Sequence, residues 1–143
     1  MEHDGAWILD VSGMEVGGVG ILATVRDHAR FGQLMLNDGV WNGERILPKG
    51  WVHEATVPDA PQVQYGKLPW GAPEGYQYQW WAVAGADHAF CAEGVHGQMI
   101  YVNPVKKLVV ARTSAWPEAW NQKYKREAWT AFEAIGTQLE HRH

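Results

Sequence analysis

Apolar residues recur along the chain with different periods, and each period predicts a different element. Between Thr24 and Leu36 the apolar positions fall at helical spacing, and Asn-Asp-Gly at 37–39 is typical of a helix end. Thr24 and Asp27 form a capping-box pattern at the start of this segment. The pattern therefore predicts an amphipathic helix that begins at Thr24.

Turn signals dominate the chain after this helix. Asn42-Gly43 lies between Val40-Trp41 and Glu44–Leu47, which predicts a β-hairpin with a two-residue turn. Pro48 favours the start of a short helix that runs to about Thr56. Residues 57–75 contain four prolines and three glycines, so we expect a long loop there.

The next apolar runs have the period of β-strands. Tyr76–Trp81 alternates aromatic and polar positions, which indicates a half-buried strand, and 85–88 is predicted to be a turn. Gln98–Asn103 and Leu108–Ala111 are apolar on both alternating sets of positions. Such a pattern is typical of central strands that are covered on both faces.

The two ends of the chain complete the predicted architecture. Residues 1–16 are expected to be an irregular lead-in, and Trp116-Pro117-Glu118 is predicted to begin a last helix with one apolar face. Residues 139–143 have the character of a tail or expression tag and receive no function. The predicted order is helices, then antiparallel strands, then a helix on the sheet. This order indicates one α+β unit over residues 1–143.

Composition excludes several classes of function. The 143 residues are 46% hydrophobic and carry a net charge of −4, and the longest basic run, Lys123–Arg126, is interpreted as a solvated helix face. We therefore expect no nucleic-acid partner. No apolar run approaches the ~20 residues of a membrane span, so no membrane partner is expected either. The single cysteine, Cys91, excludes an intrachain disulfide and is compatible with a reducing, cytoplasmic compartment.

Candidate nucleophiles and metal ligands are few. Neither Ser12 nor Ser114 lies in a Gly-x-Ser-x-Gly sequence or has lysine three positions later. Cys91 with His96 is a conceivable nucleophile–base pair, although a small buried cysteine in a strand is the more frequent arrangement. His88 and His96 with Asp87 have weak metal-ligand spacing, so neither a metal nor a cofactor is predicted. His28 and His53 are interpreted as helix-surface or core histidines.

A glycine-rich turn, Gly94-Val95-His96-Gly97, interrupts the apolar stretch from Phe90 to Pro104. Small residues at such a turn allow backbone N–H groups to approach a ligand. Two functions are compatible with this feature. The turn is one wall of a hydrolase active site, or the chain is a stand-alone module that binds a small ligand with this turn and the aromatic loop 57–75, which carries Tyr65 and Trp70.

Three blocks, in this order, resemble the C-terminal part of the serine β-lactamase-like hydrolases, the superfamily of class C β-lactamases, D-alanyl-D-alanine carboxypeptidases and related esterases. They are the glycine-rich segment and Thr-x-x-Asp-x-Ala-Arg-Phe helix start in 17–32, the hairpin in 39–48, and the Gly-x-x-Gly strand in 94–104. Tyr78–Trp81 together with 94–98 looks most similar to the 6-aminohexanoate-dimer hydrolase branch, which cleaves small linear amides and carboxylic esters.

The resemblance also implies what this chain lacks. In that superfamily a Ser-x-x-Lys motif supplies the nucleophile and a tyrosine of a Tyr-x-Asn-type motif shuttles protons. Neither motif has a counterpart in these 143 residues. The resemblance therefore implies the C-terminal portion of a hydrolase, inactive alone, which needs the missing N-terminal part of the same protein or self-associates.

Individual site residues follow from the same resemblance. The backbone N–H of Val95 corresponds to an oxyanion-hole donor, and Ala92-Glu93-Gly94 occupies the third motif, without the usual cation at Ala92. Ile21 and Leu22 occupy substrate-facing positions, and their apolar character suits an uncharged amide or ester. His96 is either a substrate contact or a packed residue beside the site.

Overall fold

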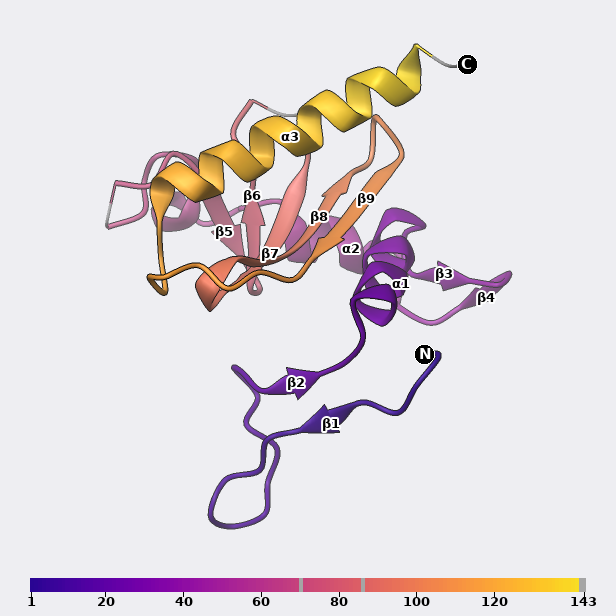
Figure 1. Cartoon of the computed structure of the whole chain (residues 1–143). Helices are drawn as coiled ribbons and strands as arrows, with labels where there is room; N and C mark the ends of the chain where they lie inside the picture. Colours follow the sequence, from indigo (N-terminus) through magenta and orange to yellow (C-terminus); the bar gives the residue numbers. More distant parts are fainter. Residues whose placement is uncertain (70, 86, 142–143) are drawn as a thin grey trace.

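The computed structural model describes residues 1–69, 71–85 and 87–141. Its centre is a five-stranded antiparallel sheet in the order β5-β6-β7-β8-β9. The strands are β5 (Gly75–Gln77), β6 (Trp80–Ala82), β7 (Phe90–Gly94), β8 (Gln98–Asn103) and β9 (Leu108–Arg112). Helix α3 (Gln122–Glu140) crosses one face, while α1 (Val25–Leu36) and α2 (Trp51–Thr56) lie on the other (Figure 1). The α+β prediction is confirmed.

Helix α1 begins where its sequence predicts. Thr24 is the N-cap, and its hydroxyl accepts a hydrogen bond from the Asp27 N–H at 3.1 Å. The Asp27 carboxylate does not complete the capping box in the expected way. It accepts from the Thr24 hydroxyl at 2.9 Å and from the backbone N–H of Glu2 at 2.6 Å, so it connects the N-terminal segment to the helix.

The predicted hairpin is present as β3 (Val40–Trp41) and β4 (Glu44–Arg45), paired antiparallel. Asn42 and Gly43 both have positive φ, as a type I′ turn requires. Helix α2 follows Gly50 and therefore begins slightly later than Pro48. In the predicted turn at 85–88, Ala86 lies outside the described residues.

The N-terminal region is more ordered than predicted. Strand β1 (Ala6–Trp7) pairs antiparallel with β2 (Ile21–Leu22), and a further bridge joins Leu9 and Glu15. Residues 1–16, expected to be an irregular lead-in, are therefore paired at Ala6–Trp7 and at the Leu9–Glu15 bridge, and contain no helix or longer strand. Strands this short have no visible period, and only their pairing across the intervening loop defines them.

The last helix begins later than the sequence predicts. Its N-cap is Asn121, whose side chain accepts a hydrogen bond from the Tyr124 N–H at 3.0 Å. Trp116 lies outside the helix. Its backbone N–H donates to the His96 carbonyl at 3.1 Å instead of taking part in the first helical turn. The predicted start at 116–118 is wrong, since this segment is bonded to the β7–β8 turn.

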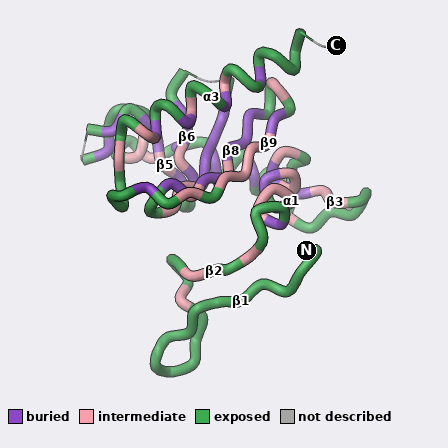
Figure 2. Tube along the Cα trace, viewed as in Figure 1, coloured by how far each residue is buried: buried purple, intermediate pink, exposed green. Residues whose placement is uncertain are grey.

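Two hydrophobic clusters lie on opposite faces of the sheet. Successive residues of a strand face opposite sides of the sheet, so Cys91 and Tyr101 pack toward α3 while Phe90 and Val102 pack toward α1 and α2. Strand β8 is therefore covered on both faces, as predicted. Figure 2 shows buried chain in the sheet and mostly exposed chain in the β1–β2 hairpin.

Close approach of α1 to the sheet depends on one glycine. A Cβ atom at Gly32 would lie 2.6 Å from Val109 Cγ1 and 2.9 Å from Ile100 Cγ2. The missing side chain thus lets the helix pack directly on β8 and β9. None of the described helices is both long and apolar enough to cross a membrane.

Candidate active site

The glycine-rich turn joins β7 to β8 as a short 3₁₀ segment, Val95–Gly97. Val95 is half exposed, and no described residue accepts a hydrogen bond from its backbone N–H. A free main-chain donor on an ordered turn can bind a carbonyl oxygen without rearrangement. The family resemblance implies such a donor role for Val95.

Hydrogen bonds from the two residues His96 and Gln98, which follow Val95, hold the turn. His96 has φ of 58°, its N–H donates to the Ala119 carbonyl at 2.9 Å, and its Nδ1 lies 2.8 Å from the Trp116 carbonyl oxygen. Because a carbonyl only accepts, Nδ1 carries the proton in this contact. Gln98 exchanges two hydrogen bonds with the backbone of Ser114, at 2.5 and 3.2 Å. The His96 side chain thus fastens the turn to the chain that precedes α3.

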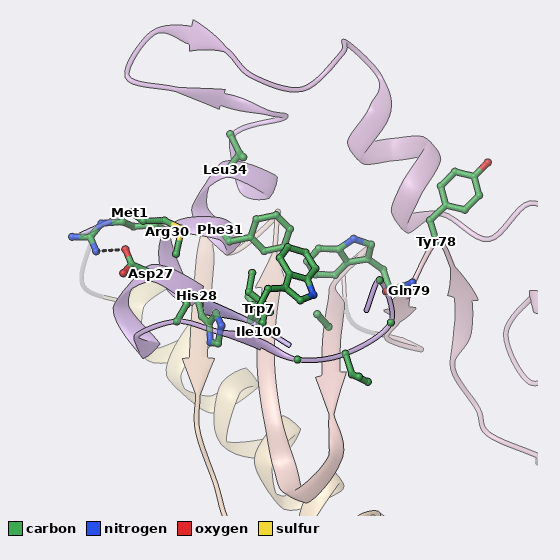
Figure 3. A pocket seen from close by; sticks show the side chains of 18 of the residues that line it. Met1, Trp7, Asp27, His28, Arg30, Phe31, Leu34, Tyr78, Gln79 and Ile100 are labelled. Atoms are coloured by element: carbon green, nitrogen blue, oxygen red, sulfur yellow. Dashed lines mark hydrogen bonds and ion pairs between the residues drawn. The ribbon is translucent and has the colours of Figure 1, made fainter. Parts of the chain in front are cut away.

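A cavity of about 690 Å³ lies between the β1–β2 hairpin, α1 and the sheet. Its walls are mainly apolar, with contributions from Trp7, Ile21, Phe31, Trp80, Ala92 and Ile100. In Figure 3, Asp27 and Arg30 form an ion pair at one end, 3.0 Å long, while Tyr78 and Gln79 lie at the other. The cavity thus has an apolar body between two polar ends.

The structure brings only some of the predicted site residues together. Ile21 and Ala92 line the cavity from the hairpin and from β7. Leu22 is exposed on the hairpin and does not line the cavity. Gly94, Val95 and His96 lie where β7 ends, outside the cavity lining.

Glu93 faces away from this cavity, toward α3. Its Oε2 lies 3.0 Å from Lys125 Nζ, and Lys125 Nζ also lies 3.2 Å from Oε1 of Glu74. All three side chains are almost completely buried. Burial raises the pKa of Glu93 to about 7, an effect that Lys125 opposes and the charge of Glu74 reinforces.

One of these residues contradicts the interpretation of the sequence. Lys125 does not lie on a solvated face, because its ammonium packs between the Trp81 and Trp129 rings, at 4.8 and 4.6 Å from their centroids. Its helical spacing with the buried residues Ala128 and Phe132 was the available signal. His28, interpreted as a helix-surface or core histidine, is partly exposed on α1 and also lines the cavity.

Among the described residues, neither serine is hydrogen-bonded to a histidine or lysine that could act as its base. Ser12 Oγ donates to Asp10 Oδ1 at 2.6 Å, and Ser114 Oγ accepts from Arg112 Nη2 at 3.1 Å. Cys91 is fully buried, and burial raises the pKa of its thiol well above its ordinary value. The conceivable Cys91–His96 pair is therefore not formed. Across the described chain, no cluster of three His, Cys, Asp or Glu residues is arranged to hold a metal ion.

The long loop 57–75 is held by hydrogen bonds within the loop and to β5. Gln64 Nε2 donates to the Pro58 carbonyl at 2.6 Å, and Asp59 accepts from Gln77 Nε2 at 3.1 Å. Tyr65 is partly exposed, whereas Trp70 lies outside the described residues. No described residue of this loop lines the large cavity. The geometry thus gives no support to a binding module built on the loop.

Comparisons with known proteins agree with this architecture. The Beta-lactamase family matches residues 1–132. A 6-aminohexanoate-dimer hydrolase from Paenarthrobacter ureafaciens is 30% identical over 119 residues, which cover 82% of this chain and 30% of that protein. A solved structure named "Putative 6-aminohexanoate-dimer hydrolase from Bacillus anthracis" superposes with a TM-score of 0.75 at 31% identity, over 94% of this chain and 34% of that one.

These matches establish the fold and the family together. The chain spans about a third of the length of the relatives that it matches. Its helices and antiparallel sheet form part of a β-lactamase/transpeptidase-like α+β fold. The chain belongs to the beta-lactamase family, among the β-lactamase-like hydrolases.

Proposed function

We propose that this chain is the C-terminal portion of a serine hydrolase that cleaves small amides or carboxylic esters through an acyl-enzyme. The observation that carries the proposal is the Val95 N–H, which has no acceptor among the described residues and belongs to a turn that His96 and Gln98 hold by hydrogen bonds. Both matched relatives bear the name 6-aminohexanoate-dimer hydrolase, which supports hydrolysis of a linear substrate.

Val95 would act on the charge that develops during acyl transfer. When a nucleophile adds to the substrate carbonyl, its oxygen becomes an oxyanion, and a preorganised N–H stabilises this transition state by roughly 3 kcal/mol. The contacts of His96 and Gln98 keep the turn in place before the substrate arrives. A main-chain donor does not depend on its side chain, so valine is suited to this position.

The cavity lining supports an uncharged substrate with an alkyl chain. Ala92 contributes apolar surface at the position where a cation would favour a substrate carboxylate, and Ile21 adds apolar surface from the hairpin. A β-lactam carboxylate would find no positive partner at Ala92. We therefore propose amides or esters rather than β-lactams as substrates.

The chain alone is proposed to be inactive. Neither serine is hydrogen-bonded to a histidine or lysine, and the relatives are about three times longer than this chain. Several large apolar side chains are exposed on the β1–β2 hairpin, among them Trp7, Ile8, Leu9, Val19 and Leu22. Such a surface suits packing against the remaining part of the same enzyme, or against a second copy of the chain.

A complementation assay tests the proposal. The purified chain is incubated with p-nitrophenyl acetate and with the linear dimer of 6-aminohexanoate, alone and with the upstream part of the protein. We expect turnover only in the mixture. Turnover by the chain alone that disappears in Ser12→Ala or Ser114→Ala would contradict the missing nucleophile. A mixture that forms a complex but hydrolyses neither substrate would contradict the proposed reaction.

A further inference from the structure

A buried group of three charged side chains includes a residue near the end of β7, the strand that leads into the turn with Val95. Glu93 comes from the end of β7, Lys125 from α3, and Glu74 from the residue before β5. Lys125 Nζ lies 3.0 Å from Glu93 and 3.2 Å from Glu74, and none of the three side chains is more than 6% exposed. We call this group the Glu74–Lys125–Glu93 cluster.

The charges of the cluster do not balance. Two ionised carboxylates and one ammonium leave a net negative charge in a buried site, which is unfavourable without further partners. Glu74 Oε2 and Glu93 Oε1 are both buried and lack a hydrogen-bond partner among the described residues. Lys125 cannot supply a second charge, and its remaining surroundings are the rings of Trp81 and Trp129. One bound proton would neutralise the cluster.

The neighbouring groups leave few other sources of charge. The thiol of Cys91 lies on the same strand face as Glu93 and interacts electrostatically with it. A small cavity of about 10 Å³ beside Glu93 is lined by Asn121 and Gln122 at the start of α3, and by Met99, Trp116 and Trp120. Apart from Glu93 and Lys125 themselves, the lining groups are uncharged, and the space suits at most one water molecule.

We propose that Glu93 and Lys125 are positioning residues for the Val95 turn, and that the Glu74–Lys125–Glu93 cluster binds one exchangeable proton. Glu93 is separated from Val95 only by Gly94, so the carboxylate that Lys125 holds fixes the strand end from which the turn begins. Loss of the proton leaves a net negative charge close to the Val95 N–H. Its effect on hydrolysis rests on the proposed function, whereas the binding of the proton does not.

The electrostatics place this exchange in the neutral range. Burial raises the pKa of Glu93 to about 7, the attraction of Lys125 opposes the rise, and the charge of Glu74 adds to it. The proton is therefore bound in mildly acidic solution and released in mildly alkaline solution. A buried carboxylate paired with one lysine and no second acid would instead remain ionised over this range.

Nuclear magnetic resonance on the isotopically labelled 143-residue chain tests the proposal without any need for activity. The Glu93 carboxyl carbon and the Val95 amide are followed from about pH 5 to about pH 9. We expect both signals to titrate with a common midpoint within about one unit of pH 7, and Glu93→Gln to abolish the amide transition. Glu133→Gln is the matched control. Glu133 also lies on α3, but it pairs with Lys106, so its substitution should leave the transition in place.

The ring of His96 adjoins Val95 and needs its own variant. A Val95 transition that persists in Glu93→Gln but vanishes in His96→Gln would overturn the proposal. If Glu93→Gln does not fold, the carboxyl signal of Glu93 in the unmodified chain still tests the proposal. A titration midpoint of that signal below about pH 5.5 would exclude the proton site. Inactivity in the complementation assay with a normal Glu93 titration would contradict only the proposed function.

Discussion

The indole of Trp116 packs directly on Gly97, so closely that a Cβ atom at Gly97 would lie 2.4 Å from Trp116 Cε2. Gly97 also has φ of 86°, which L-residues rarely adopt. The last residue of the turn is thus restricted by both space and backbone conformation. Through this contact, the segment before α3 supports the turn that carries Val95.

Gly97→Ala should strongly destabilise the chain. The new methyl group must displace the Trp116 ring, and the backbone strain adds to this, so we expect a loss of about 2–4 kcal/mol in the free energy of unfolding. Gly85→Ala is a matched control, because Gly85 has φ of 75° but no atom within 4 Å of the added carbon. It should lose only about 1 kcal/mol. Urea unfolding compares the two, and equal losses would contradict the role of the Trp116 contact.

Val95→Pro should remove the proposed oxyanion donor while retaining a similar backbone. In the complemented enzyme we expect kcat to fall about 10²–10³-fold, because proline has no N–H. Val95→Ala keeps the N–H and should remain within a few-fold of the unmodified enzyme. A normal kcat for Val95→Pro, with the complex intact, would show that another group stabilises the oxyanion.

The free energy of unfolding should fall as pH rises from about 4.5 to about 7. The pKa of Glu93 is raised in the folded state to about 7, so the folded chain binds more protons than the unfolded chain over this window. The change is at most about 3 kcal/mol, at about 1.4 kcal/mol per pH unit. Glu93→Gln should flatten this dependence. Urea unfolding at several pH values measures both, and parallel curves for the two proteins would contradict the prediction.

Asp27→Asn should release the N-terminal segment from α1. Burial opposes ionisation, but hydrogen bonds from Glu2, Thr24, His3 and Arg30 lower the pKa of Asp27 to about 2. The carboxylate therefore stays charged and bonded until the pH falls toward that value. We expect faster proteolysis of residues 1–20 in Asp27→Asn than in Asp38→Asn, an exposed control paired with Arg45. Equal cleavage rates would show that other contacts hold the hairpin.

Local signals explain the elements that the sequence predicts correctly. Thr24 caps α1, and Asn42-Gly43 forms a turn that few other dipeptides favour. Each of these features depends on residues within a few positions. The start of α3 depends on a residue far away in the chain. From local sequence Pro117 is a plausible first helical residue, but the backbone N–H of Trp116 donates to the His96 carbonyl and the helix begins later.

The site was less predictable because it depends on which face each side chain occupies. Ala92 and Glu93 are neighbours in one strand, so only one of them can face the cavity. The sequence assigns both to the substrate, whereas the structure directs Glu93 to Lys125. That partner lies 32 residues later in the chain, and no local pattern joins the two.

The two walls of the large cavity differ in how freely they can change during evolution. Ala92 and Ile100 belong to the sheet that forms the core, whereas Trp7, Val19 and Ile21 lie largely exposed on the hairpin. Substitutions at exposed positions usually alter stability by less than about 0.5 kcal/mol. New ligand preferences can therefore arise by substitutions in the hairpin while the sheet, and the turn that it carries, stay unchanged.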